Sequence, residues 1–217
     1  MTGPDLTPVG KPTSRTGRPV LAVGWPLGFQ ALVDSGEVTD TPWQVHLGGE
    51  FLDLPEDAYR VWSLAVGGAS RPELIKAAAA AGIAEADDAE EIVGGLMRAD
   101  ALVELDDDPL ANSDIFEHLC ICRVGIGLGN SAERPNAFRI GRVGGGVLAT
   151  VDPRVFGVWS LSNGSVSIAE ACRRLAANFS HTEEPDAEDF SWIVRQLAVN
   201  LRPLIRGGSA FLDLHGR

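Results

Sequence analysis

The sequence predicts an α+β protein made of two copies of one small domain, each a small antiparallel sheet with three helices. Two observations carry this prediction. The tetrapeptide VWSL ends at Leu64 and again at Leu161, 97 positions later. Around each copy, glycines, an aromatic residue, a Ser and a Glu recur at the same offset. Similarity at so long a period indicates a duplicated domain, because repeat architectures have periods of about 20–50 residues.

The offset of 97 positions aligns an ordered series of residues: Gly48-Gly49 with Gly145-Gly146, Tyr59 with Phe156, Trp62 with Trp159, Gly67 with Gly164, Ser70 with Ser167 and Glu73 with Glu170. With a slip of four residues, Val23–Gly28 also resembles Val124–Gly129. We therefore expect a first repeat at 19–105, a linker at 106–119 and a second repeat at 120–217. The tail at 1–18 is rich in Pro, Gly and Thr and is expected to be disordered.

Short runs of apolar residues predict the strands. VLAVG at 20–24 and CICRVGIGL at 120–128 open the two repeats. WQVHL and EFLDL flank one pair of glycines, and FRIGRV and VLATVD flank a second group. Glycine tolerates the positive φ of tight turns, so each pair of runs predicts a hairpin. ALVEL at 101–105 and SAFLDL at 209–214 are expected to close the repeats.

Three helices follow in each repeat. The first carries an apolar stripe, at Ala58, Val61, Trp62 and Ala65 and again at Val155, Val158, Trp159 and Ser162. Ser70 with Glu73, and Ser167 with Glu170, predict capping boxes for the second helix. The third helix is expected to turn inward Ile92, Leu96 and Met97 in one repeat, and Phe190, Ile193, Val194 and Leu197 in the other. VWSL is thus core sequence, with no chemistry in it.

Composition and charge argue against several classes of function. The chain is 45% hydrophobic and 22% charged, with a formal net charge of -12 and a pI near 4.7. This charge repels phosphate backbones and anionic membrane surfaces, which argues against nucleic acid or membrane partners. No apolar run approaches the roughly 20 residues of a membrane span, and the N-terminus lacks the apolar core of a signal peptide. Three cysteines do not suggest a disulfide framework, so we expect a cytoplasmic protein.

Catalytic motifs are missing from the sequence. It contains no P-loop, Gly-x-Ser-x-Gly, HExxH or CxxC pair, so we expect no enzyme and no cofactor. His118, Cys120 and Cys122 alternate, and on a strand all three would face one side, where they could bind a soft metal such as zinc. No fourth ligand is evident nearby, so we expect no metal. Cys172 aligns with Ile75 and is expected to be a buried apolar residue.

The stretches EFLDLPEDAYRVWSLAVGGASRPELIKAAAA and EEIVGGLMRADALVEL resemble the PqqD-like group of winged-helix proteins, the peptide chaperones and leader-recognition domains of modified-peptide biosynthesis. The resemblance covers most of 45–105 and, more loosely, 138–200. The chain departs from the group's pattern in being duplicated. The resemblance implies two tandem winged-helix-like domains that bind an extended peptide, which adds as a strand to the hairpin and lies against the third helix.

This resemblance implies a peptide-binding groove along 50–54 and 87–98, with an equivalent along 147–151 and 186–196. The candidate residues are Glu50, Phe51, Leu52, Asp53, Leu54, Ile92, Gly94, Gly95, Leu96 and Arg98. An exposed strand edge offers unpaired backbone groups, and a neighbouring helix offers apolar pockets. We favour the first repeat because EFLDL alternates cleanly and because two adjacent glycines would allow a close approach to the helix.

The function expected is therefore a non-catalytic peptide- or protein-binding module, an accessory that brings a precursor peptide to its modifying enzyme. One alternative is a DNA-binding winged-helix regulator, in which the start of the third helix enters the major groove. That start is acidic in both repeats, at Asp87, Asp88, Glu90 and Glu91 and at Asp186, Glu188 and Asp189, and these carboxylates would face phosphates. A second alternative is a tandem winged-helix scaffold that bridges a protein complex.

Overall fold

The structure, a computed structural model, describes residues 17–34, 37–179 and 190–216. Helices and small antiparallel sheets make up this part of the chain, which confirms the predicted α+β class. Most of the predicted tail at 1–18, and the acidic residues at 186–189, lie outside the described residues.

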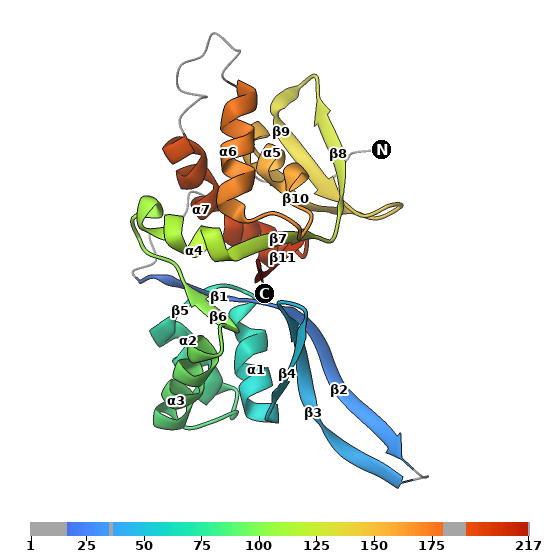
Figure 1. Ribbon diagram of the computed structural model, residues 1–217, viewed down its shortest axis with the longest axis vertical. Helices are drawn as coiled ribbons and strands as arrows, with labels where there is room; N and C mark the ends of the chain where they lie inside the picture. Colours follow the sequence, from blue (N-terminus) through green and yellow to red (C-terminus); the bar gives the residue numbers. More distant parts are fainter. Residues whose placement is uncertain (1–16, 35–36, 180–189, 217) are drawn as a thin grey trace, which may run out of the picture.

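The molecule has two parts, one above the other in Figure 1. We call residues 17–105 the N-terminal half and residues 119–216 the C-terminal half. The N-terminal half contains β1 (Pro19–Ala22), β2 (Trp25–Asp34), β3 (Glu37–Leu47), β4 (Glu50–Leu54), α1 (Glu56–Ala65), β5 (Ala69–Ser70), α2 (Arg71–Ala80), α3 (Ala86–Arg98) and β6 (Leu102–Glu104). After η1 (Pro109–Asn112) and α4 (Ser113–His118), the C-terminal half contains β7 (Leu119–Arg123), β8 (Ile126–Ser131), β9 (Arg134–Gly141), β10 (Val147–Val151), α5 (Pro153–Leu161), α6 (Ile168–Phe179), α7 (Phe190–Arg206) and β11 (Ala210–Leu214).

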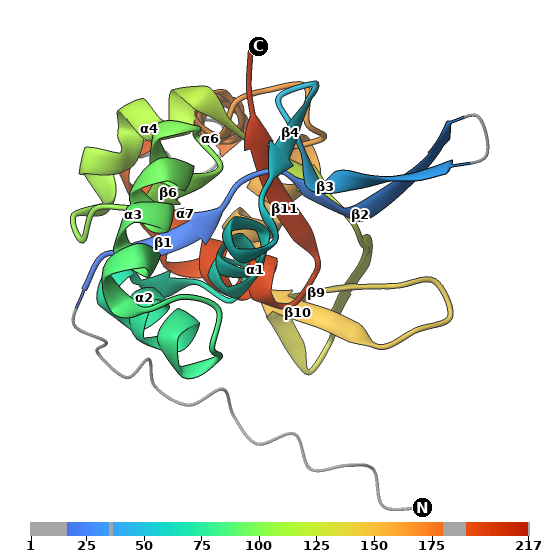
Figure 2. The same cartoon turned by 90° about the horizontal axis from the view of Figure 1, so that it is seen from below.

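The sheets have related topologies in the two halves. The first strand pairs antiparallel with the last one, β1 with β6 and β7 with β11. A separate three-stranded antiparallel sheet follows in each half, in the order β2-β3-β4 and β8-β9-β10. Figure 2 shows that the β2–β3 and β9–β10 hairpins extend from the same side of the molecule.

Strands β2 and β8 correct the strand prediction. The run CICRVGIGL does not form one strand at 120–128, because the chain leaves β7 after Arg123 and enters another sheet as β8. No strand was predicted at Trp25–Asp34, where β2 lies. The change of sheet needs glycine in both halves, since a Cβ on Gly24 would lie 2.7 Å from the His46 carbonyl oxygen, and one on Gly125 2.8 Å from that of Gly141.

Glycines lie in the tight turns of the sheets. Gly48 and Gly49 link β3 to β4 with φ of 61° and 92°, the positive values that a two-residue hairpin turn requires. The predicted hairpin at this place is therefore confirmed. The glycines at 144–146 likewise lie between β9 and β10.

Most of the helix residues expected to face inward are buried. Ala58, Val61, Trp62 and Ala65 of α1 are buried, as are Val155, Val158, Trp159 and Ser162 in the C-terminal half. In α3, Leu96 is buried but Ile92 and Met97 are only half-buried, because Ala89 and Val93 take the fully inward positions. In α7, Ile193, Val194 and Leu197 are buried and Phe190 is half-buried. This helix runs to Arg206.

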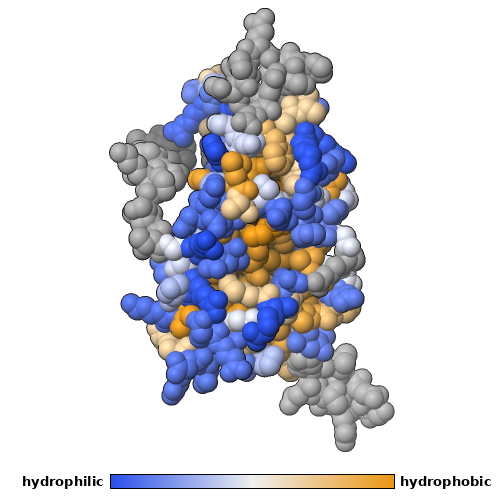
Figure 3. Space-filling model, turned by 60° about the vertical axis from the view of Figure 1, so that its left-hand side comes forward, coloured by the Kyte–Doolittle hydropathy of each residue, from blue (hydrophilic) through white to orange (hydrophobic). Residues whose placement is uncertain are grey.

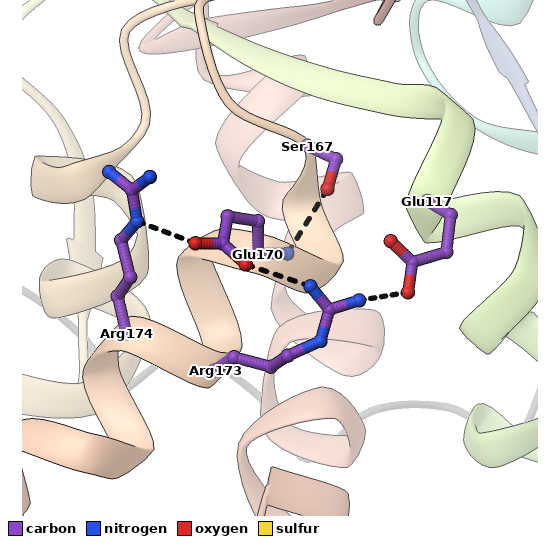
Figure 4. Close-up of polar contacts among 5 residues, drawn as sticks. All are labelled: Glu117, Ser167, Glu170, Arg173 and Arg174. Atoms are coloured by element: carbon purple, nitrogen blue, oxygen red, sulfur yellow. Dashed lines mark hydrogen bonds and ion pairs between the residues drawn. The ribbon is translucent and has the colours of Figure 1, made fainter.

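The two capping boxes differ. In α2, the backbone N–H of Ser70 donates to the Glu73 carboxylate over 3.0 Å, and the reciprocal bond is present, as predicted. In α6, the Glu170 N–H donates to the Ser167 hydroxyl over 3.1 Å, but the Glu170 carboxylate accepts from Arg173 and Arg174 instead (Figure 4). Arg173 also pairs with Glu117 of α4, so the second box is only half formed and its Glu joins an ion-pair network.

The segment predicted as a linker is folded. Residues 109–118 form η1 and α4, and Phe116 is fully buried. The buried amide of Asn112 accepts from the Asp106 N–H at 2.6 Å and donates to the Asp106 carbonyl at 3.1 Å. The buried Phe116 packs into the core, and Asn112 bonds this segment to Asp106.

The two halves share one continuous hydrophobic core. Backbone and side-chain contacts cross the seam between them. The Gly24 N–H donates to the Leu212 carbonyl at 2.8 Å, and the Gly48 N–H donates to the Asp213 carboxylate at 2.7 Å. The Arg202 guanidinium donates to the Gly67 carbonyl at 3.3 Å. The halves therefore form one packed body.

Replacing either repeated tryptophan with alanine should destabilise the protein by about 3–5 kcal/mol, as large-to-small changes in a core do. Trp62 and Trp159 are each almost fully buried, and their indole N–H groups donate to the Val23 and Ser209 carbonyls at 3.0 and 3.2 Å. Urea denaturation of Trp62→Ala and Trp159→Ala measures both losses. A loss below about 1 kcal/mol for one of them would show that the two rings do not have equivalent core roles.

Candidate functional site

Strand β4 is an edge strand. It pairs with β3 and with no other strand of the described chain. Leu47 and Glu50 flank the two-residue turn and face each other, so they form a hydrogen-bonded pair, and the pairs then alternate along the ladder. The backbone groups of Phe51 and Asp53 consequently point away from β3. Nothing in the described chain bonds to them, so this edge can accept another strand.

The face of the β2-β3-β4 sheet that lies over α1 belongs to the core. Val45, Leu47 and Leu54 are buried on it. Further along, the Trp43 ring lies 4.8 Å from that of Tyr59, between ring centroids, and Tyr59 lies 5.8 Å from Trp62. Aromatic and aliphatic packing therefore fixes this sheet on α1.

The opposite face carries a row of aromatic side chains that continues across the seam. Trp25, His46 and Phe51 are direct register neighbours on β2, β3 and β4. The His46 and Phe51 ring centroids are 5.7 Å apart, and Trp25 lies 4.7 Å from Phe211 of β11. We call Phe51, His46, Trp25 and Phe211 the aromatic row. Phe51 is 66% exposed and Trp25 40%, so much of the row faces solvent.

Acidic side chains accompany this exposed edge. On the face of the aromatic row, Asp53 accepts a hydrogen bond from the Gln44 amide at 2.8 Å. Glu50, Glu56 and Asp57 are exposed at the ends of β4 and the start of α1. The edge and its surroundings are therefore negatively charged.

The α3 residues of the candidate groove lie apart from β4. In Figure 1, α1 stands between α3 and β4. Leu96 is buried and Ile92 half-buried against the core, while Arg98 is exposed. A Cβ on Gly94 would lie 3.4 Å from the Arg98 guanidinium and 4.0 Å from that of Arg71.

The structure thus corrects the single groove expected along 50–54 and 87–98. It brings Glu50, Phe51, Leu52, Asp53 and Leu54 together on one edge, and Ile92, Gly94, Gly95, Leu96 and Arg98 together on one helix, but it does not bring the two sets together. The reason is packing: α1 buries its apolar stripe between the sheet and α3. Arginine side chains also lie over the surface that the two glycines were expected to leave open.

The end of α7 approaches the corresponding strand of the C-terminal half at Leu148. This strand, β10, packs against the end of α7, where a Cβ on Gly207 would lie only 2.5 Å from the Leu148 carbonyl oxygen. The turns that end α3 and α7 have the same geometry. Asp100 and Gly208 both have positive φ. The Ala101 N–H donates to the Leu96 carbonyl, and the Ser209 N–H donates to the Leu204 carbonyl. By this match, the N-terminal half has Ala99 where the C-terminal half has Gly207.

His118 does not lie on the strand that carries Cys120 and Cys122. Cys120 is buried on β7, Cys122 is half-buried, and His118 is exposed at the end of α4, before the strand begins. Among the residues that the structure describes, no three His, Cys, Asp or Glu side chains are grouped so as to hold a metal ion. The hydrogen bond between the two β7 thiols lowers the pKa of Cys120 and raises that of Cys122. Burial raises the pKa of Cys172 to about 12, consistent with the apolar role expected for it.

A hollow at the seam marks a second surface feature. Figure 3 shows hydrophobic residues gathered at mid-height, where the halves meet. A cavity of about 250 Å³ between the halves is lined by the start of β1, the segment around η1 and the face of α7 with Ala198, Val199 and Arg202. Arg202 reaches the N-terminal half here. Arg202 is therefore engaged with the other half, whereas Val199 on the same face is 64% exposed.

No protein-family model matches the sequence, and neither the curated proteins nor the solved structures contain a match. Within the described residues, no helix has both the length and the apolar composition needed to cross a membrane.

Sequence reasoning missed three members of the aromatic row. Alternation in WQVHL places His46 on the face opposite Val45, and this signal was available. The positions of Trp25 and Phe211 depend on the register of β2 and on contact with β11, 186 positions away along the chain from Trp25. Neither the register of β2 nor the contact with β11 produces a recognisable pattern in the nearby sequence.

Gly207→Ala should destabilise the protein by about 1–3 kcal/mol, because the added methyl group would collide with the Leu148 carbonyl and force β10 from α7. The matched change Ala99→Gly, at the end of α3, should cost no more than about 1 kcal/mol. Chemical denaturation of both variants measures the difference. Equal losses would contradict the different packing beside the two strands.

Proposed function

We propose that this protein is a non-catalytic module that binds an extended segment of a peptide or protein partner, which adds as a strand to β4. The open edge of β4 supports this most directly, because Phe51 and Asp53 have backbone groups with no partner in the described chain. Such an edge supplies affinity through main-chain hydrogen bonds, and the side chains beside it supply specificity. The exposed ring of Phe51 gives an added strand an apolar surface to contact.

We also propose that the two halves are copies of one winged-helix-like unit. Equivalent contacts support this. Phe138, Phe156 and Trp159 stack with centroid separations of 4.7 and 5.6 Å, close to the 4.8 and 5.8 Å of the corresponding rings in the N-terminal half. The Val23 N–H donates to the Ala101 carbonyl, and Val124 donates to Ser209 in the same way.

Only the N-terminal copy would bind a partner strand under this proposal. In the other copy, the end of α7 packs against β10 at Leu148. Under this proposal the two copies have different roles, and the C-terminal copy stabilises the N-terminal copy through the shared core. Together with the resemblance to leader-recognition domains, this favours a cytoplasmic accessory that delivers a precursor peptide to a modifying enzyme.

Asp53→Pro should weaken partner binding at least about tenfold relative to Asp53→Ala. Both variants lose the carboxylate, but only proline removes the outward N–H that would bond an added strand. Peptides selected from a random 12-residue display library on the full chain serve as the partner. Their affinities for the two variants are measured by fluorescence polarisation, and circular dichroism checks that each variant is folded.

The double variant Gly94→Leu with Gly95→Leu is the control, because it alters the α3 surface and leaves β4 unchanged. Peptides that bind the control normally and fail to bind Asp53→Pro support the β4 edge. Equal binding to the two Asp53 variants, or failure of any peptide to be enriched, would refute the proposal.

Duplex DNA should not bind with sub-micromolar affinity at about 150 mM salt, because phosphate contacts require basic side chains along the interface. The net charge of -12 and the seam contact of Arg202 both oppose such contacts. An electrophoretic shift assay with random-sequence duplexes tests this. Tight binding that weakens steeply as salt rises would favour the regulator alternative.

A further inference from the structure

We infer that the segment added to β4 is basic and alternating, with an apolar side chain opposite Phe51 and a Lys or Arg two residues away, opposite Asp53. This inference rests on the proposed function and specifies the chemistry of the partner. It follows from the positions of side chains on one face of one strand.

Strand pairing sets which side chains meet. Residues directly opposite each other in neighbouring strands project to the same face, with Cβ atoms about 4.5–5.5 Å apart. Phe51 and Asp53 project to the face of the aromatic row, as the ring contact with His46 and the bond from Gln44 show. Two side chains of an added strand, two residues apart, would therefore lie beside Phe51 and Asp53.

The position beside Phe51 favours an apolar or aromatic side chain. The row from Phe51 through His46 and Trp25 to Phe211 crosses four strands and ends in solvent at Phe51. With 66% of its surface exposed, Phe51 has much apolar area left to bury. Aromatic and β-branched residues are the favoured cross-strand partners of an aromatic ring.

The position beside Asp53 favours a cation. Residues 50–57 contain four acidic side chains and no basic one. Among them, Glu56 has Arg60 within 4.0 Å, whereas Glu50 and Asp53 have no ion pair in the described chain. The whole N-terminal half has 15 acidic and 5 basic residues, against 9 and 11 at 119–217. An acidic partner segment would be repelled at this edge, and a basic one attracted.

Three synthetic nonapeptides test the inference on the full chain. The first has Lys, Phe and Lys at its third, fifth and seventh positions and Thr elsewhere, so that all three side chains share one face of a strand. The second replaces both Lys with Glu. The third keeps the composition of the first but moves Phe by one position, onto the other face. Affinities are measured by polarisation of a terminal dye and by amide chemical shifts of β4.

The Lys peptide should bind about tenfold more tightly than the Glu peptide, and the advantage should shrink as salt is raised. It should also bind more tightly than the peptide with displaced Phe. Asp53→Asn, which keeps an acceptor for Gln44, should reduce the Lys preference to about threefold or less. Asp87→Asn, which removes an exposed carboxylate on α3, is the matched control and should leave the preference unchanged.

Equal affinities for the Lys and Glu peptides, or a preference that survives Asp53→Asn, would overturn this inference. The proposed function would then stand if library peptides still lose binding to Asp53→Pro. If the Lys peptide binds Asp53→Pro as well as it binds Asp53→Ala, the β4 edge is not the site and both proposals fail.

Discussion

The peptide groups of Val23 and Gly24 hold three parts of this protein together. The Val23 N–H donates to the Ala101 carbonyl at the turn that ends α3. The Val23 carbonyl accepts a hydrogen bond from the indole N–H of the buried Trp62. The next N–H, that of Gly24, donates to Leu212 in the other half. Gly24 has a φ of 99°, and a Cβ there would meet Val45 at 2.6 Å, so only glycine fits. One short stretch thus fixes the helices, the sheet and the seam.

The position of the candidate site depends on this constraint. Strand β2 begins directly after Gly24, so the bond to Leu212 brings Trp25 against Phe211. The Gly48 N–H, in the turn before β4, is bonded to Asp213 of the same strand β11. Strand β11 therefore supports the sheet at two places, and β4 remains the outer edge. A rigid edge loses less entropy when it binds an extended segment than a mobile one would.

The two halves share contacts but differ in the surfaces they leave exposed. Gly207 lets the end of α7 approach β10, whereas the matching Ala99 carries a methyl group and α3 lies apart from β4. Charge differs as well, with acidic residues concentrated in the N-terminal half. Strand addition requires an open edge, and the end of α7 approaches β10 at Leu148 whereas α3 lies away from β4.

The sequence by itself determined the α+β class, the apolar stripes around Trp62 and Trp159 and the turn at Gly48-Gly49, because each depends on residues a few positions apart. It also identified Glu50–Leu54 as a strand. Only the tertiary structure decided that Trp25–Asp34 forms another strand, that α1 separates β4 from α3, and that residues 109–118 fold onto the core. The aromatic row is the clearest case: Phe211 joins it through a hydrogen bond between Gly24 and Leu212. Such contacts join residues remote in sequence, and no local periodicity encodes them.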